Sequence, residues 1–208
     1  MNYHRTLPGI IILLLLVVTA CSKAPYTGRE RLLLLSEKQE LNMGAQSFQA
    51  LMKTNKKKIN RDPTINAHVR RVGERIARAS GKNYKWEFVV IQEDKTPNAF
   101  VLPGGKVFVY TGILPLTLNE HGLAAVMGHE VAHAIARHGG ERVSQQILVS
   151  TSMVAVSLAL SKSESRTSRL TMAALGAGVT VGVMLPFSRL HESEADRLGL
   201  IFMAKAGY

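Results

Sequence analysis

The segment His129-Glu130-Val131-Ala132-His133 carries residues whose types and spacing can do chemistry. Residues four apart lie on one face of a helix, so the two imidazoles can bind one metal ion. Glu130 lies about 100° further round the helix than His129, near that ion but not necessarily on it. There it can act as general base towards a water molecule whose pKa a zinc ion has lowered. The pattern predicts a catalytic site with one Zn²⁺ per chain.

The same five residues could instead be a surface helix with two unrelated histidines. The neighbouring side chains argue against this alternative, because most of the helix is apolar and its polar groups would be buried. A buried histidine or glutamate needs a compensating partner, and a metal ion can supply one. The apolar positions are Val126, Val131, Ala132 and Ala136.

A catalytic zinc ion usually takes three protein ligands, so a third ligand must lie elsewhere in the chain. The metzincin pattern would need a glycine and a histidine where Ala136 and Gly139 stand, which excludes that class. Further on, Glu192 and Asp196 lie four residues apart on one face of a helix predicted to end near Gly207. We expect Glu192 to complete the zinc site and Asp196 to accept the free N–H of a zinc-bound histidine. Two acids at this spacing are otherwise most often a solvated helix face.

These residues must be positioned by helices and a small sheet. A capping box of Ser36 and Gln39 predicts a helix to about Lys53, and Asp62 with Pro63 opens a second helix that ends near Gly81. A helix over residues 119–138 carries the motif, and Gly139-Gly140 is expected to stop it. Strands are predicted at 86–90, 99–102 and 107–110, the last two joined by a Pro103-Gly104-Gly105 turn. The expected fold class is therefore mainly helical α+β, with a small antiparallel sheet beside the motif helix.

The first twenty residues are predicted to be a lipoprotein signal peptide. Ile10 to Val18 is an apolar run too short to span a bilayer, and small residues precede Cys21. This arrangement resembles a lipobox, in which Cys21 receives lipid and residues 21–35 form a lipidated tether. An uncleaved membrane anchor with a chance cysteine is the alternative. Since Cys21 is the only cysteine, the zinc site must use His, Asp or Glu ligands.

Two later apolar stretches and a basic cluster allow more than one interpretation. Residues 170–187 approach membrane-spanning length, although a pair of closely packed soluble helices is favoured over a span. The chain has a formal net charge of +11, which attracts it to anionic surfaces such as lipid headgroups. Its densest basic cluster, residues 53–61, lacks the interleaved aromatics that stack on bases, so we expect no nucleic-acid partner.

Taken together, H-E-V-A-H followed by S-R-L-H-E-S-E-A-D-R resembles the HtpX-like zinc metallopeptidases related to the CAAX prenyl proteases. The resemblance extends over residues 36–208, includes Asn98-Ala99-Phe100 and Pro103-Gly104-Gly105, and with the lipobox points to the periplasmic lipoprotein branch. It implies a gluzincin-type core in which Glu192, rather than Glu194, is the metal ligand. It also implies that a strand near Asn98 and Ala99 binds extended substrate by backbone pairing. Members of that branch continue further, so we expect the domain to be incomplete at its C-terminal end.

The expected function is a zinc endopeptidase that cleaves extended or misfolded proteins at the periplasmic face of a bacterial membrane. The outer membrane is favoured over the inner membrane. The alternative is a non-enzymatic zinc-containing chaperone or assembly lipoprotein. Arg189 lies near the site in sequence and is expected to make a structural ion pair rather than to stabilise an oxyanion. Three further histidines are expected to be structural: His121, His138 and His191. His138 lies in the last turn of the predicted helix, where the helix dipole favours partial positive charge.

Overall fold

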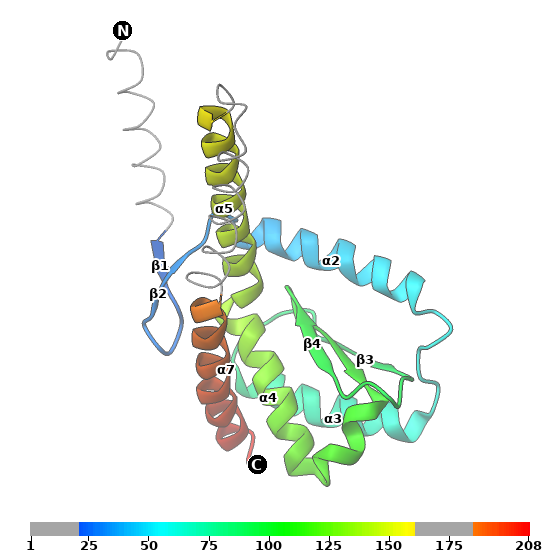
Figure 1. Cartoon of the computed structure of the whole chain (residues 1–208). Coiled ribbons are helices and arrows are strands. Elements are labelled where there is room, and N and C mark those ends of the chain that lie inside the picture. Colours follow the sequence, from blue (N-terminus) through cyan, green and yellow to red (C-terminus); the bar gives the residue numbers. More distant parts are fainter. Residues whose placement is uncertain (1–20, 161–184) are drawn as a thin grey trace, which may run out of the picture.

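The computed structural model describes residues 21–160 and 185–208 and confirms a mainly helical α+β fold. The helices are α2 (Glu37–Thr54), α3 (Pro63–Ala79), α4 (Glu120–Ala136), α5 (His138–Leu160) and α7 (Leu185–Lys205). The strands and the 3-10 helix are β1 (Cys21–Lys23), β2 (Glu30–Leu32), β3 (Glu87–Ile91), β4 (Ala99–Leu102), β5 (Lys106–Tyr110) and η2 (Thr111–Thr117). Of the α-helices in these residues, α3 and α4 pack on one face of a small three-stranded sheet and α2 packs on the other (Figure 1).

Local capping signals set the start of α2 and α3, as the sequence predicts. Ser36 Oγ accepts a hydrogen bond from the backbone N–H of Gln39, and the Gln39 side chain accepts one from the backbone N–H of Ser36. Asp62 Oδ1 accepts from the N–H groups of the first turn of α3. Pro63, at the start of that turn, has no N–H group that would need an acceptor. Gly81 follows the end of α3 with φ of +72°, the left-handed conformation that glycine adopts most easily.

The sheet has the strand order β3-β5-β4 and is mixed rather than antiparallel. β4 and β5 form the predicted hairpin, turning at Gly104 and Gly105, which both have positive φ. The prediction is wrong for β3, which runs parallel to β5 with Glu87 opposite Lys106. Residues 92–98 carry the chain past β5 before β4 begins, so β3 and β4 lie on opposite sides of β5. This leaves β4 at an edge of the sheet.

The motif helix α4 ends earlier than predicted, and the two glycines do not end it. Arg137 takes the left-handed conformation with φ of +59°, and α5 begins at the next residue. Gly139 and Gly140 therefore lie inside α5. A Cβ on Gly140 would meet Glu40 Oε1 at 1.9 Å, so this glycine permits a close approach of α2 to α5.

Helices α4 and α7 lie side by side and pack directly against each other (Figure 1). Gly128 and Gly199 permit this approach, because a Cβ on Gly199 would lie 3.0 Å from the backbone of Gly128 and of His129. The buried side chains of α4 then join those of α3, β5 and α7 in one apolar core. Its members include Val72, Val107, Met127, Val131, Leu198 and Phe202.

Residues 21–32, expected only to be a tether, form an antiparallel β1–β2 hairpin that packs against α5 (Figure 1). The Arg31 guanidinium donates to the carbonyl oxygen of Ala136 at the end of α4. The backbone N–H of Leu34 donates to Ser144 Oγ of α5 at 2.9 Å. Buried polar contacts of this kind are invisible to local sequence patterns, because both partners are distant in the chain.

Two predictions fall outside the described residues. The signal peptide, residues 1–20, is one, and most of the apolar stretch 170–187 is the other, since residues 161–184 are not described. Within the ranges 21–160 and 185–208, none of the helices combines the length and apolar character that a membrane crossing requires.

Candidate metal centre

Helices α4 and α7 bring together the three residues predicted to bind metal. His129 Nε2 lies 3.0 Å from His133 Nε2 and 3.2 Å from Glu192 Oε2, and His133 Nε2 lies 3.5 Å from the same Glu192 oxygen. The two histidines come from adjacent turns of α4, while Glu192 lies on α7, 63 positions after His129. Among the described residues, these are the only three that form such a group.

The spacing of these three atoms fits a zinc ion. A tetrahedral site with Zn–N and Zn–O bonds of about 2.0–2.2 Å places its ligand atoms roughly 3.3 Å apart. Three lone-pair-bearing atoms at this separation repel one another unless a cation lies between them. The imidazoles suit this role, because burial is the main cause that lowers the pKa of His133 and keeps its ring neutral. The donor set of two histidines and one carboxylate is one that catalytic zinc sites use.

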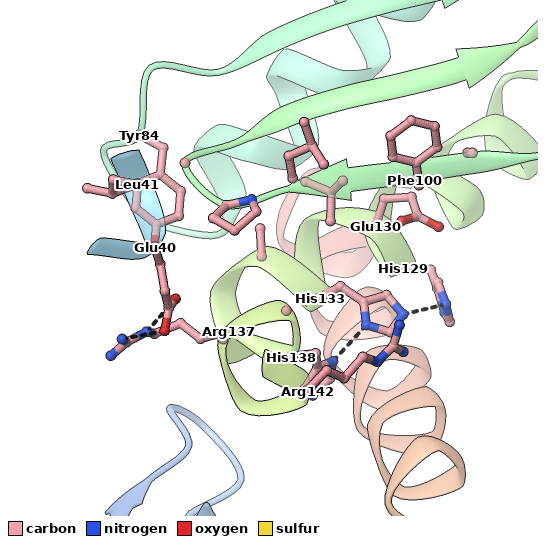
Figure 2. Close-up of a pocket in the computed structure, with 18 of the residues that line it drawn as sticks. Glu40, Leu41, Tyr84, Phe100, His129, Glu130, His133, Arg137, His138 and Arg142 are labelled. Carbon is pink, nitrogen blue, oxygen red and sulfur yellow. Dashed lines mark hydrogen bonds and ion pairs between the residues drawn. The ribbon is translucent and has the colours of Figure 1, made fainter. Parts of the chain in front are cut away.

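Each histidine is held through its second ring nitrogen. His129 Nδ1 lies 2.9 Å from Asp196 Oδ1, the contact that the sequence predicts for Asp196. His133 Nδ1 lies 2.7 Å from Nδ1 of His138, as the dashed line in Figure 2 marks. His138, expected to be a structural residue in the last turn of the motif helix, instead begins α5 and contacts a candidate ligand. The break at Arg137 turns the chain so that the first residue of α5 faces the metal centre.

Glu130 lies beside the three candidate ligands without joining them. It is mostly buried, and the loss of solvent raises the pKa of its carboxyl group to about 7. Glu130 and Phe100 of β4 line the same groove (Figure 2). A carboxyl group with a pKa near neutrality can both take up and release a proton at physiological pH.

The groove along β4 has a volume of about 370 Å³ and ends at the candidate metal centre. Asn98 and Ala99, predicted to contact substrate, line it together with the rest of the edge strand. The opposite wall comes from α4 and the start of α5, where Arg137 holds Glu40 through two bonds of 2.7 and 3.0 Å (Figure 2). The groove is therefore open to an extended chain lying alongside β4.

One residue of the site, Arg142, was not predicted from the sequence. Arg142, on α5, donates to Glu192 Oε1 at 3.1 Å and lines the groove, and only the folding of α5 over α7 brings it there. Glu194 faces away from the three candidate ligands and bonds His138 instead. His191 is fully buried 3.0 Å from Glu141, as a structural histidine should be. Arg189, on α7, is exposed.

Comparisons with known proteins identify the chain's relatives. It is 46% identical to the mitochondrial metalloendopeptidase OMA1 of Schizosaccharomyces pombe over 140 residues, which are 67% of this chain and 39% of that protein. It is 34% identical to metalloendopeptidase OMA1 of Danio rerio over 210 residues, covering 95% of this chain and 43% of the relative. A putative beta-barrel assembly-enhancing protease of Vibrio cholerae is 32% identical over 174 residues, which are 82% and 35% of the two chains. The chain thus spans less than half the length of each of these three relatives.

The profile of peptidase family M48 matches residues 63–208. This range contains both helices of the metal centre and the whole β3-β5-β4 sheet. Because the match covers most of the chain, this protein belongs to peptidase family M48.

Proposed function

We propose that the chain is a zinc endopeptidase in which His129, His133 and Glu192 hold the metal and Glu130 is the general base. The observation that carries this proposal is the convergence of three ligand atoms from α4 and α7, 3.0–3.5 Å apart, beside a buried carboxyl group. A structural zinc site usually closes with a fourth protein ligand. Only three candidate ligands converge among the described residues, which leaves one position for water.

The protein's own groups can perform peptide hydrolysis in order. A bound zinc ion would supply Lewis acidity, which acidifies water and polarises a carbonyl group. Glu130 takes a proton from the attacking water and delivers it to the departing amine nitrogen, two roles that a pKa near 7 permits. Asp196 and His138 keep the imidazole rings fixed while this happens, because each engages the ring nitrogen that faces away from the metal centre.

The proposed substrate is an extended or unfolded protein segment. β4 is an edge strand, so its free backbone N–H and C=O groups can pair with an added strand, and Asn98 and Ala99 lie where that strand would reach the metal centre. A folded protein cannot present an extended strand to this edge without local unfolding. We infer that substrates are selected by their backbone conformation before their side chains.

Replacing Glu130 with Gln tests the catalytic proposal. The variant should bind zinc as the wild type does, because Glu130 is not among the candidate ligands, but should cleave unfolded casein about 10²–10⁴-fold more slowly. Zinc content by mass spectrometry and peptide release measured together distinguish the two properties. Glu120→Gln, at the half-buried first residue of the same helix, is the matched control and should retain activity. Undiminished cleavage by Glu130→Gln would rule out Glu130 as the base, whereas a zinc-loaded wild type that cleaves nothing would favour the non-enzymatic role.

We further propose that the protein acts at the periplasmic face of a bacterial membrane, more specifically as an outer-membrane lipoprotein in protein quality control. The lipobox-like residues before Cys21 support this, as does the similarity to a Vibrio cholerae protein described as a putative beta-barrel assembly-enhancing protease. Because Cys21 opens β1, a lipid there would hold the docked hairpin, and the peptidase with it, close to the membrane surface.

Expression in a Gram-negative host with a labelled fatty acid tests the proposed lipid anchor and membrane location. The wild type should incorporate label and sediment with outer membranes, whereas Cys21→Ser should incorporate none and be found in soluble periplasm. Label in the Cys21→Ser protein, or its firm membrane association, would contradict the lipid anchor.

A further inference from the structure

A buried network of charged and polar groups joins the N-terminal hairpin to the metal centre. Arg29, between β1 and β2, donates from Nη1 and Nη2 to the two oxygens of Glu141 at 2.9 and 2.7 Å. Its Nε donates to Glu194 Oε2 at 2.8 Å, so one guanidinium group bridges α5 and α7. Both carboxylates are almost completely buried, with at most 4% of either side chain exposed. A guanidinium in this position offers the planar fork that two carboxylates require.

The arrangement keeps Glu194 ionised. Its Oε2 accepts from Arg29 Nε and its Oε1 accepts from Thr27, so both oxygens act as acceptors beside the positive charge of the guanidinium group. An ionised carboxylate can only accept hydrogen bonds. His138 Nε2, 3.0 Å from Glu194 Oε2, must therefore carry the proton and donate it.

The position of the proton on His138 determines the position of the proton on His133. A neutral imidazole has one donor and one acceptor nitrogen, so His138 Nδ1 becomes the acceptor once Nε2 donates. The 2.7 Å contact between the two Nδ1 atoms then requires His133 to donate from its own Nδ1. His133 Nε2 is left with the lone pair, directed at His129 and Glu192. Arg29 and Glu194 thus determine which nitrogen of His133 carries the proton, and they leave the lone pair on the nitrogen that faces the metal centre.

We propose that Arg29 is a positioning residue of the metal centre, acting through Glu194 and His138 to fix the tautomer and orientation of His133. The N-terminal hairpin is accordingly part of the metal-binding apparatus rather than a passive tether. The inference rests on the proposed role of His133 as a zinc ligand. It adds a requirement which that role does not contain, namely that a segment outside the matched family region supports the ligand.

Arg31 provides a control within the same hairpin. It is also buried and anchors the hairpin by donating to Ala136, but it forms no hydrogen bond with Glu141, Glu194 or His138. Loss of Arg31 should therefore weaken hairpin docking without removing the charge that Glu194 needs. Any effect specific to Arg29 must come from the carboxylate network.

The experiment compares zinc dissociation constants of full-length wild type, Arg29→Gln, Arg29→Lys and Arg31→Gln, measured by competition with a chelator. Visible spectra of the cobalt-substituted proteins and melting temperatures of the metal-free proteins accompany them. Arg29→Gln should bind zinc about 10–100-fold more weakly and shift the cobalt bands, as loss of a group supporting a metal ligand does. Arg29→Lys, which retains the charge but not the fork, should fall between it and wild type. Arg31→Gln should lower the melting temperature while leaving the zinc constant within about twofold.

The outcomes separate this inference from the proposed function. If wild type binds zinc and Arg29→Gln binds it equally well with unchanged cobalt bands, the inference is overturned while the zinc site stands. If His133→Ala binds zinc as tightly as wild type, the proposed ligand set itself fails. Should Arg29→Gln not fold, Thr27→Val removes one bond to Glu194 at a half-buried position, and an unaltered zinc constant and spectrum in that variant would also overturn the inference.

Discussion

The two candidate histidine ligands receive their support from environments of opposite character. Asp196, which holds His129, has 72% of its side chain exposed, whereas the His138 side chain that holds His133 is 1% exposed. A hydrogen bond to an exposed carboxylate competes with water, while a buried one does not. We therefore expect the two supports to differ in how strongly their loss affects metal binding.

Replacing Asp196 with Asn should weaken zinc binding by about tenfold, the lower end of the range for groups that support a ligand. The Asn oxygen can still accept from His129 Nδ1, but the negative charge that raises the ligand's basicity is lost. Competition with a chelator measures the change. Glu74→Gln, an exposed acid on α3, is the control and should have no effect. A loss larger than that of Arg29→Gln would contradict the expected order.

The metal centre also depends on how closely two helices approach. Glu192 reaches the two histidines only because α7 packs directly on the backbone of α4 at Gly128 and Gly199. Neither glycine has positive φ, so conformational freedom does not explain them. Their small size sets the separation of the two halves of the site.

Gly199→Ala should therefore destabilise the protein by about 1–3 kcal/mol and weaken zinc binding, because the added Cβ would push α7 away from His129. Gly139→Ala on α5 is the matched control. Its Cβ would meet only Pro103 at 3.8 Å, and alanine favours a helix over glycine by about 1 kcal/mol, so stability should hold or rise. Urea unfolding of the metal-free proteins and chelator competition give both quantities. Equal behaviour of the two variants would refute the close-packing argument.

At the scale of the whole molecule, the ion pairs of Arg29 with Glu141 and Glu194 link the N-terminal hairpin to α5 and α7. Burial opposes the charge of Glu141, yet the hydrogen bonds from Arg29, with His191 Nε2 3.0 Å away, outweigh it and lower the pKa of Glu141 to about 2, from 4.5. A carboxyl group whose pKa falls on folding stabilises the folded state above its unfolded pKa. That stabilisation is lost as the pH falls through the folded pKa.

The metal-free wild type should consequently exceed Glu141→Gln in stability by about 3 kcal/mol at pH 7, and the difference should shrink between pH 4.5 and 2. Chelated protein is used so that zinc release does not contribute. Urea midpoints over this pH range provide the measurement. A difference that stays constant with pH would mean that Glu141 does not carry the charge assigned to it.

The sequence by itself determined the features that depend on neighbours in the chain. The spacing of His129 and His133, the caps at Ser36 and Asp62, and the β4–β5 turn all follow from local backbone geometry. Glu192 and Asp196 were predictable because they share a helix face four residues apart and a third zinc ligand was needed, and the family resemblance implied Glu192 rather than Glu194.

Only the tertiary structure decided the features whose partners lie far apart. The parallel pairing of β3 with β5, the position of Gly140 against Glu40 and the place of Arg29 between two carboxylates leave no local signal. His138 shows the reason most directly, since one left-handed residue, Arg137, turns it towards His133. Spacing within one helix determines which residues can bind a metal ion together, whereas packing between elements determines which residues hold those ligands in place.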